Sequence, residues 1–402
     1  MDRFTSIAYP VRVHAGQDAL NALPAELDRV AASRALVICG RSVAGKTHLI
    51  DRIRALLGHR FVGLYSKIGK DAPLGDVQEA AEVARDCQAD ILIAVGAGSV
   101  IKATRVIAIL LAESGTIDQL VTQYPADASA VSPRLHARKH PIINVLTAGT
   151  SAQHRAGSAL KNEYGSYRLE FFDPKTRPLA IFWDADALLT APPSLALSTG
   201  VAVYWRALMN MGVVEHANPL VQGSRRQAFN LAQKAIGSLT DSSNPQARID
   251  ICAAALLQNR DEDDGGRPFD AHWVARVVYA LAAATFNLVD GVDQGSASAI
   301  LTGPALCHFG HMCPEAVVEM GKALEAWPVG QHDESSAPRV VGKAAVSVFG
   351  AMGIPVRLRD LGVPHEQLAE IVRISLRNFN ADRERGLANH QDLLAAVLHD
   401  AW

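Results

Sequence analysis

Three observations predict an α/β domain built on a parallel sheet, followed by an all-helical domain. The chain has 402 residues, which is more than one hydrophobic core usually holds and fits two domains. In the first half, short apolar runs alternate with helical patterns, as in βαβ units on a parallel sheet. From Pro192 onward strand-like runs nearly vanish and long Ala- and Leu-rich stretches replace them. We therefore expect an α/β domain over residues 1–190 and an all-helical domain over residues 191–402.

The first half contains continuous apolar runs, which are typical of strands buried on both faces of a parallel sheet. These predicted strands cover residues 35–39, 61–65, 90–95, 141–146 and 179–183. The segments between them have helical periodicity at residues 47–57, 74–87 and 100–113. Strand, helix and strand at these spacings predict a Rossmann-like parallel sheet.

The second half is predicted to be helical. Its apolar, helix-forming stretches cover residues 194–211, 225–240, 245–258, 272–288 and 336–352. The charged segment 261–267 (DEDDGGR) is expected to be a glycine-containing loop whose charges lie in water rather than a metal site.

Composition excludes several classes of partner. Lys and Arg number 39 against 41 Asp and Glu, so no net field favours nucleic acid or an anionic membrane. No apolar run reaches the roughly 18 residues of a membrane span, and residues 1–10 lack the pattern of a signal peptide. The five cysteines are few and mostly in apolar surroundings, which favours reduced thiols and a cytoplasmic protein.

Two glycine-containing loops could hold phosphate, and the first fits the P-loop pattern G-x-x-x-x-G-K-[ST]. It runs from Gly40 to Thr47, between a predicted strand and a predicted helix. In a true P-loop, backbone N–H groups and Lys46 would hold phosphates, and Thr47 would hold magnesium. An aspartate that could complete such a site, Asp184, ends another apolar run.

The second loop is Ala94-Val95-Gly96-Ala97-Gly98-Ser99, which also ends a buried strand and begins a helix. Small residues let the backbone approach a pyrophosphate, and a helix N-terminus supplies N–H groups and a positive dipole. A plain tight turn would explain the same residues.

Several ordered segments resemble the iron-containing alcohol dehydrogenase family, most closely its maleylacetate reductase branch. The residues that carry this likeness are YPVRVHAG at 9–16, AVGAGSVI at 94–101, PIINVLTAGTS at 141–151, FDPKTRP at 172–178, IFWDADALLT at 181–190, PPSLALSTG at 192–200, GIPVRLRDLG at 353–362 and the terminal Trp402. The resemblance implies an α/β Rossmann-like domain followed by an all-α domain, the architecture of iron-containing alcohol dehydrogenases and dehydroquinate synthase.

The resemblance also implies a cofactor, NAD(H) or NADP(H), and the residues that bind it. It assigns the pyrophosphate to the loop at 94–101 and treats the P-loop match as a coincidence, with Gly40 and Ser42 kept as cofactor contacts. The other implied cofactor-binding residues are Gly96, Ala97, Gly98, Ser99, Thr147, Thr150 and Ser151.

The metal ligands of the family are largely missing from this sequence. Family dehydrogenases hold one divalent metal with an aspartate and three histidines, the first two of them one helical turn apart. Ala202 and Arg206 stand at those two positions, and neither side chain can ligate a cation. His311 aligns with the fourth ligand, and the family spacing places the third at residues 296–298, where there is no histidine. We therefore expect no bound metal, with a site rebuilt from His308, His311 and cysteines as the alternative.

Other departures lie near the cofactor loop. Lys102 replaces a family aspartate, and Arg105 replaces a family lysine. Ser151-Ala152-Gln153 stands where the family has Gly-Ser-Glu. Lys102 could favour an additional phosphate, or it could point into solvent.

Without a metal, a carbonyl substrate needs another electrophile, and a fixed positive charge can serve. Arg206 is the first candidate, because a guanidinium can also grip a carboxylate in bidentate fashion; a salt bridge to a neighbour is the alternative. His311 could transfer a proton near neutral pH, or it could be a structural histidine. Tyr204 is a third catalytic candidate, because it could shape the pocket, or it could pack in the core.

These residues suggest a metal-independent NAD(P)H-dependent reductase that acts on a small carboxylated carbonyl compound. The resemblance implies a homodimer. Two alternatives stay open: a repurposed enzyme with non-redox chemistry, such as dehydration or cyclisation, and a non-catalytic protein that binds a dinucleotide. A polar pocket with Arg206 and His311 converging would favour an enzyme. A pocket filled by Tyr204 and Trp205 would favour the binding protein.

Overall fold

The computed structural model describes residues 3–125, 129–163, 165, 167–328, 330 and 334–402. The chain forms two compact units. The α/β unit comprises Ala8–Ala196 and Leu239–Leu256, and the helical unit comprises Met1–Ile7, Leu197–Ser238 and Leu257–Trp402. Each unit combines segments that are distant in the sequence. The predicted division of the chain into residues 1–190 and 191–402 therefore stays a prediction.

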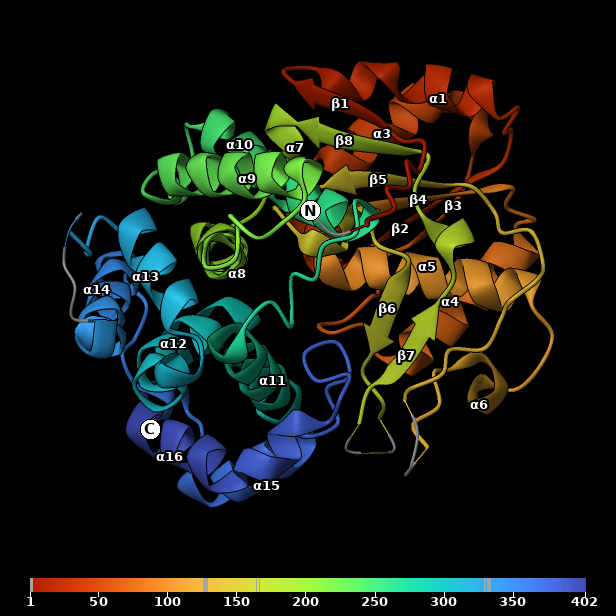
Figure 1. Cartoon of the computed structure of the whole chain (residues 1–402). Coiled ribbons are helices and arrows are strands. Elements are labelled where there is room, and N and C mark those ends of the chain that lie inside the picture. The colour runs from red at the N-terminus through yellow and green to blue at the C-terminus, as the bar shows by residue number, and fades with distance from the viewer. Residues whose placement is uncertain (1–2, 126–128, 164, 166, 329, 331–333) are drawn as a thin grey trace. The chain divides into compact units, whose positions relative to one another are not determined.

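The α/β unit is built on a six-stranded, wholly parallel sheet with the order β1-β8-β5-β4-β2-β3, drawn in Figure 1. Its strands are β1 (Arg12–Gly16), β2 (Ala35–Cys39), β3 (Phe61–Tyr65), β4 (Ile91–Gly96), β5 (Ile142–Leu146) and β8 (Ala180–Asp184). The five predicted apolar runs are all strands, within one residue at each end. The predicted fold class, a parallel-sheet α/β region followed by a helical region, is confirmed.

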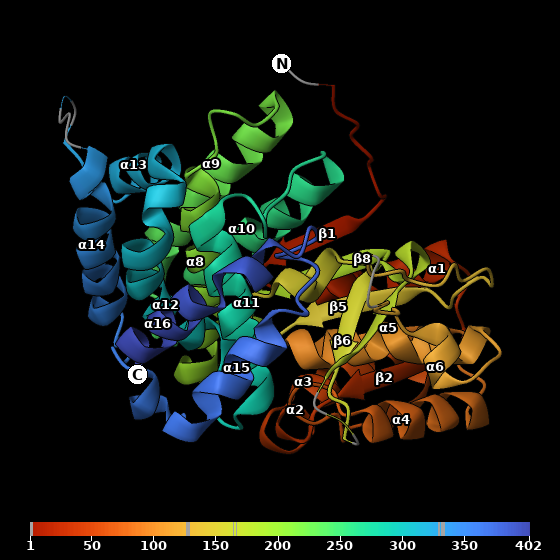
Figure 2. The same cartoon turned by 60° about the horizontal axis from the view of Figure 1, so that its bottom comes forward.

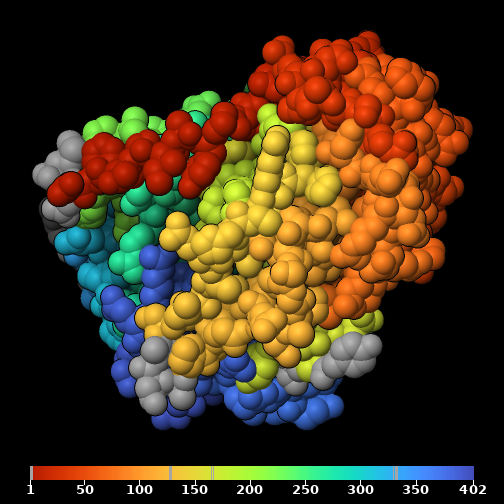
Figure 3. Space-filling model, turned by 90° about the vertical axis from the view of Figure 1, so that its right-hand side faces the viewer, coloured from red at the N-terminus to blue at the C-terminus, as the bar shows by residue number. Residues whose placement is uncertain are grey.

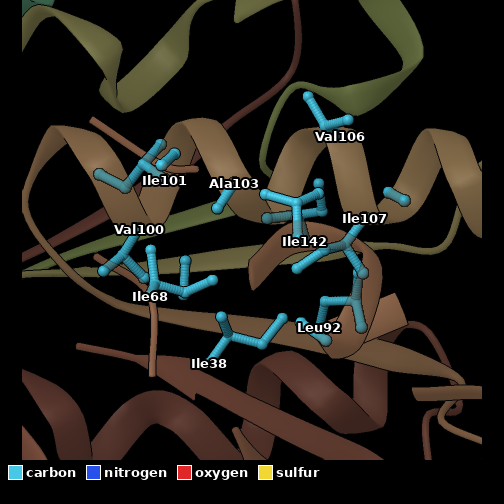
Figure 4. Close-up of a cluster of buried hydrophobic side chains, with 14 of the residues drawn as sticks. Ile38, Ile68, Leu92, Val100, Ile101, Ala103, Val106, Ile107 and Ile142 are labelled. Atoms are coloured by element: carbon cyan, nitrogen blue, oxygen red, sulfur yellow. The ribbon is translucent and has the colours of Figure 1, made fainter. Parts of the chain in front are cut away.

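Alternate residues of each strand point to opposite faces of this sheet, so both faces present apolar side chains and helices cover both. On one face, α4 (Leu74–Asp86) and α5 (Gly98–Ala112) lie side by side and pack on residues such as Ile38, Leu92 and Ile142 (Figures 2 and 4). On the other face, α1 (Leu23–Arg29) and α3 (Leu49–Leu57) pack on residues such as Val37 and Ile93. The remaining helices of this unit are α2 (Arg41–Lys46), α6 (Ile117–Leu120) and α7 (Ala185–Leu189).

A two-stranded antiparallel hairpin that the sequence did not reveal lies against α5. Its strands are β6 (Gly157–Leu160) and β7 (Leu169–Phe172). Each strand is only four residues long, and neither GSAL nor LEFF alternates apolar with polar residues along its length, which is the sequence signal of a half-buried strand.

The helical unit contains nearly all of the later helices. They are α8 (Pro193–Met211), α9 (Pro219–Ile236), α10 (Pro245–Asp263), α11 (Trp273–Leu288), α12 (Gln294–Phe309), α13 (Pro314–Ala323), α14 (Ala337–Ala351), α15 (Leu368–Ser375) and α16 (Gln391–Ala401), with the start of α8 and the first part of α10 assigned to the α/β unit. No helix in the described ranges is long and apolar enough to cross a membrane.

Helix α12 packs against α11, α14 and α16, and two of its glycines lie very close to residues of α8 and α14. A Cβ at Gly295 would lie 2.1 Å from the Ser198 carbonyl oxygen, and one at Gly303 would lie 2.6 Å from a Val346 methyl group. These glycines lower intrinsic helix propensity, but they let neighbouring helices approach. That is why a glycine- and serine-rich segment with an internal Pro304 is nevertheless a buried helix.

The expectation that the charges of segment 261–267 lie in water is wrong for Asp261, Asp263 and Asp264, which are buried, whereas Glu262 and Arg267 are exposed. Helix α10 continues to Asp263, and Asp261 is 1% exposed. Its carboxylate accepts two hydrogen bonds from Arg225, at 2.6 and 3.2 Å. The helix ends in a Schellman motif, in which the Gly266 N–H donates to the Asp261 carbonyl while Gly265 adopts a φ of 87°.

The N-terminal segment belongs to the helical unit and runs past this helix end. Ser6 Oγ donates to an Asp264 carboxylate oxygen at 2.7 Å, and the Ile7 N–H donates to the Asp263 carbonyl at 2.8 Å. Figure 3 shows the segment, in red, lying across green residues of the same unit. The acidic segment is therefore covered partly by the beginning of the chain, a contact between residues more than 250 positions apart.

The Arg225–Asp261 pair provides a stability prediction. Arg225→Met should leave a buried carboxylate without its partner and lower the free energy of unfolding by about 3–5 kcal/mol. Arg226→Met is the matched control, because the neighbouring Arg226 pairs with Glu215 at the surface and should contribute no more than about 1 kcal/mol. Chemical denaturation monitored by circular dichroism measures both. Equal losses in the two variants would contradict the structural role of the buried pair.

Candidate functional site

The junction between β4 and α5 has the geometry of a phosphate-binding turn. Gly96 ends β4 with a φ of 158°, and a Cβ there would lie 2.8 Å from a Val100 methyl group. Ala97 is the N-cap of the fifteen-residue helix α5, and no side chain caps that helix. The first N–H groups of a helix have no intrahelical acceptor, so those after Ala97 are available to an anion.

The position of this junction in the sheet also favours ligand binding. Adjacent strands β2 and β4 are followed by helices on opposite faces, since α3 packs on one side of the sheet and α5 on the other. Ligands of open α/β sheets bind outside the carboxyl ends of the strands at such a switch point. Cys39 is paired with Val95, so Gly40 follows β2 beside the end of β4. Ser42, the second contact expected there, is exposed on α2.

The P-loop match at residues 40–47 does not have the geometry of a phosphate cradle. Residues Arg41–Lys46 form helix α2, and the Val43 and Ala44 N–H groups donate to the Gly40 carbonyl. Thr47 Oγ1 donates to the Val43 carbonyl at 2.7 Å. The backbone donors and the hydroxyl that a P-loop turns toward phosphate are therefore used within the protein.

Asp184, the aspartate that could have completed a P-loop site, is also used structurally. It is fully buried and caps α7 by accepting from the Ala187 N–H at 3.1 Å. Its two carboxylate oxygens also accept from Arg52, at 2.8 and 3.1 Å, and one accepts from the Leu20 N–H. These contacts explain Asp184 without magnesium.

The segment after β5 lies directly beside the phosphate-binding turn. The Thr147 N–H donates to the Gly96 carbonyl at 3.2 Å. Thr150 Oγ1 lies 3.2 Å from the place of a Cβ on Gly98, and it accepts from the Ala152 N–H at 3.1 Å. The structure thus gathers the loop at 96–99 with the predicted contacts Thr147, Thr150 and, one residue further along the chain, Ser151.

Arg105 holds that segment on α5. This side chain is 2% exposed and donates from Nε to Ser158 Oγ at 2.9 Å. Its other nitrogens donate to the carbonyls of Ala152, at 2.5 Å, and Gly157, at 2.8 Å. Burial is the main cause that lowers the pKa of Arg105, to about 9. A lysine, with one nitrogen, could not make this set of contacts.

Gln153 explains another departure from the family pattern. It is fully buried, and its Oε1 accepts from Trp183 Nε1 at 2.9 Å while its Nε2 donates to the Cys252 carbonyl at 2.8 Å. A glutamate could make the first contact but not the second, because an ionised carboxylate has no proton to donate. The amide at position 153 therefore fits this core.

Lys102 lies one helical turn after Gly98, in surroundings with excess positive charge. Asp71, from the loop after β3, donates its N–H to Ser99 Oγ at 3.0 Å, and its carboxylate pairs with Arg168 at 3.2 Å. Burial, Arg168 and Arg105 together lower the pKa of Lys102 to about 7, whereas Asp71 opposes the shift. Neither Asp71 nor Arg168 could be placed here from the sequence, because both come from distant loops.

Tyr204 and Arg206 face different surroundings on α8. Two residues along a helix rotate the side chain by about 200°, so the two point in nearly opposite directions. Tyr204 is 2% exposed between Phe229 and Phe349, with ring centroids 5.9 and 6.0 Å away. Burial raises the pKa of its hydroxyl to about 12. These contacts make Tyr204 a core residue, so the catalytic role expected for it is withdrawn.

Arg206 is buried against aromatic rings, with its guanidinium carbon 4.1 Å from the Phe269 centroid and 5.9 Å from that of Tyr279. Arg206 also contributes to the electrostatic surroundings of Asp261. A desolvated guanidinium over aromatic faces keeps its charge in a low-dielectric environment.

His311 is exposed on the short 3-10 turn Gly310–Met312, and no contact in the described ranges connects it to Arg206. The convergence of Arg206 with His311 that would favour an enzyme is therefore not seen among the described residues. Trp205, which could have filled the pocket, stacks on Tyr279 and donates from Nε1 to Thr302 Oγ1 at 3.0 Å.

The residues at the metal-ligand positions do not fit a metal. Ala202 has no donor atom and Arg206 has only N–H donors. At the expected third position, Ser296 donates to the N-cap of α12: the Asp293 carboxylate accepts from the Ser296 N–H at 2.9 Å and from Ser296 Oγ at 2.7 Å. Within the described part of the chain, no three His, Cys, Asp or Glu side chains gather as a metal-binding group.

A comparison with known families bears on this set of residues. Residues 10–185, which contain the sheet and the phosphate-binding turn, match the family model described as iron-containing alcohol dehydrogenase. The resemblance to the iron-containing alcohol dehydrogenase family is thereby confirmed.

Relatives of this family match most of the chain. Alcohol dehydrogenase 4 of Saccharomyces cerevisiae is 22% identical over 336 residues, covering 83% of this chain and 82% of the relative. Maleylacetate reductase of Sphingobium indicum is 25% identical over 370 residues, covering 92% and 90%. The chain is thus similar over most of its length to an alcohol dehydrogenase and to a maleylacetate reductase.

Solved structures of similar proteins share the fold. A 1,3-propanediol oxidoreductase has a TM-score of 0.83 at 21% identity and covers 100% of both chains. A sulfoacetaldehyde reductase of Bifidobacterium kashiwanohense, solved in complex with NAD+, has a TM-score of 0.76 at 18% identity and covers 98% of this chain and 97% of that chain.

A pair of glycine substitutions distinguishes the two phosphate-loop hypotheses. Gly96→Ala should weaken dinucleotide binding at least roughly tenfold, because the new methyl group meets Val100 and the backbone conformation is strained. Gly45→Ala should leave binding unchanged, since a Cβ there meets nothing within 4 Å in helix α2. Quenching of protein fluorescence by NADH or NADPH measures both. Weak binding in Gly45→Ala with normal binding in Gly96→Ala would reverse the assignment.

Proposed function

We propose that this protein is an NAD(P)H-dependent oxidoreductase resembling maleylacetate reductase, which reduces a small carboxylated carbonyl compound without a bound metal. The observation that carries the proposal is the turn at Gly96, where the backbone leaves no room for a side chain at the carboxyl end of β4. That turn leads into a helix with uncapped N–H groups, which suits a pyrophosphate.

Residues of the α/β unit would hold the dinucleotide. Gly96, Ala97, Gly98 and Ser99 would surround the pyrophosphate, with Thr147, Thr150 and Ser151 beside them and Gly40 at the end of the next strand. The nicotinamide ring of a bound dinucleotide supplies the hydride. The chain's own contribution is to bind and orient that cofactor through a turn whose shape Arg105 and Val100 maintain.

Arg206 is the proposed electrophile in place of a metal. Its fixed charge would stabilise negative charge that develops on the substrate oxygen, or would grip a substrate carboxylate. Its contacts with Phe269 and Tyr279 support this role, because they hold the guanidinium in one place and away from bulk water. Arg206 needs no titration to act, since a guanidinium stays protonated at neutral pH.

A second candidate is a dinucleotide-binding protein without turnover on the same fold. The observation that favours it is the exposure of His311 away from any described contact with Arg206. In that case the α/β unit would still bind the nucleotide, but no substrate would be reduced.

One preparation of purified protein tests the cofactor and the metal together. Titration with NADH and with NADPH should give saturable binding of at least one of them, and elemental analysis should find substoichiometric iron and zinc. Stoichiometric metal would overturn the metal-independent mechanism. Absence of binding for both nucleotides would overturn the proposed oxidoreductase.

Substitution of Arg206 tests the mechanism. With a carboxylated carbonyl substrate such as maleylacetate, Arg206→Ala should lower kcat by about 10²–10³, as removal of one oxyanion-stabilising group does. Arg206→Lys keeps a charge and should retain part of the rate, while nucleotide affinity should be unchanged in both variants. Thermal unfolding shows whether each variant remains folded. A folded Arg206→Ala variant with an unchanged kcat would remove Arg206 from the mechanism.

A further inference from the structure

A buried arginine of the α/β unit uses only one edge of its guanidinium group. Arg248 lies in the first turn of α10 and is 2% exposed. Its Nη1 donates to the carbonyls of Leu188 and Ala191, at 2.6 and 2.8 Å. Its Nε and Nη2 are buried as well, yet no atom in the described ranges accepts a hydrogen bond from either. One edge of the guanidinium therefore fixes the side chain, and the other edge lacks an acceptor.

The two atoms without an acceptor form a fork. In a guanidinium group, the N–H groups of Nε and Nη2 lie side by side in one plane and point in the same direction. Their spacing matches the two oxygens of a carboxylate or two oxygens of a phosphate, which bind such an edge in bidentate fashion. An oxyanion is therefore the ligand class that this edge of Arg248 fits.

The charge of Arg248 is also unbalanced. Burial alone lowers its pKa, and no charged group of the described residues contributes to that shift. Arg225, another buried arginine, is in contrast paired with the carboxylate of Asp261. A buried charge without a partner lowers stability, and a bound anion would offset that cost.

The position of Arg248 in the fold favours a ligand. Leu188, which accepts from its Nη1, belongs to α7, the helix directly after β8. Ile251, one turn further along α10, contacts the segment after β5, where a Cβ on Gly149 would lie 2.3 Å from an Ile251 methyl group. Arg248 is thus held by segments that follow β5 and β8. Ligands of open α/β sheets bind beyond these carboxyl ends of the strands.

The strand order indicates which oxyanion belongs there. The phosphate-binding turn follows β4, and the order β8-β5-β4 places β8 two strands away from it. Neighbouring strands are about 4.8 Å apart, so the ends of β8 and β4 are separated by roughly 10 Å. This separation favours an anionic group other than the pyrophosphate, and the substrate class of the proposed function contains one, a carboxylate.

We propose that Arg248 binds a carboxylate of the substrate through Nε and Nη2. The inference rests on the proposed function, because it names a residue that recognises the carboxylated substrate class. Two charge-assisted hydrogen bonds would form, and no covalent bond changes. An uncharged carbonyl compound would leave the buried fork empty, so Arg248 selects carboxylated compounds.

Isothermal titration calorimetry of the full-length protein with maleate, a dicarboxylate without the carbonyl group, tests this inference. Titrations are made without nucleotide and with saturating NADH or NADPH, and the unmodified protein should bind maleate saturably. Arg248→Lys keeps the charge and a donor for the two carbonyls but has no fork. It should bind maleate roughly tenfold more weakly, with the nucleotide affinity unchanged. Thermal unfolding shows whether the variant remains folded.

Arg34→Lys is the matched control, because Arg34 also donates to two carbonyls, those of Cys87 and Gln88. It does so from Nε and Nη2, so the chain itself fills that fork. This variant should keep the maleate affinity of the unmodified protein. Equal weakening in both variants, or weaker nucleotide binding with normal maleate binding in Arg248→Lys, would overturn the inference.

The two proposals fail in different ways. An unmodified protein that binds nucleotide but no maleate would overturn the inference alone, whereas one that binds maleate but neither nucleotide would overturn the proposed function. If Arg248→Lys does not fold, a crystal structure of the unmodified protein with maleate decides. A carboxylate within hydrogen-bond distance of Nε and Nη2 of Arg248 is expected, and maleate bound only elsewhere would overturn the inference.

Discussion

The candidate cofactor site depends on one buried guanidinium. Arg105 connects helix α5, which begins at the phosphate-binding turn, to the carbonyls of Ala152 and Gly157 and to Ser158. Those residues follow the segment that contains Thr147, Thr150 and Ser151. Removal of Arg105 would take a donor from the carbonyls of Ala152 and Gly157 and from the buried Ser158 hydroxyl, which is costly in a core. Two parts of the nucleotide site that are about fifty residues apart in sequence therefore keep one geometry through a single side chain.

The sequence predicted the sheet well because the signal for a buried parallel strand is local. Continuous apolar runs such as Ala35–Cys39 need both faces covered, and the helices between them supply that cover. The hairpin β6–β7 gave no such signal. Helix α12 was missed for a different reason: its glycines look like helix breakers until neighbouring helices are known to pass within contact distance of Gly295 and Gly303.

Charged residues were harder to place than apolar ones. Segment 261–267 was expected to be a solvated loop because its four consecutive acidic residues have no obvious partner nearby in the sequence. The partner of Asp261 is Arg225, which comes from another helix. The resemblance correctly pointed to the loop at 96–99, since its residues are contiguous. The resemblance could not place Asp71 and Arg168 near Lys102. Contacts between distant loops leave no periodic pattern in the sequence. Sequence thus predicts the backbone of this site better than its electrostatics.

In helix α8, the two positions that hold metal ligands in the family are occupied by other side chains. The two family ligand positions lie one turn apart, and here they hold a small residue, Ala202, and a long cation, Arg206. In the family, a dication held by aspartate and histidine side chains would place positive charge on one face of this helix. Here a guanidinium stacked on Phe269 places positive charge on the same face. The guanidinium carries its own charge, so it needs no ligand at position 202. Changing both residues together therefore preserves the sign of the local field, which is the property that a developing oxyanion requires.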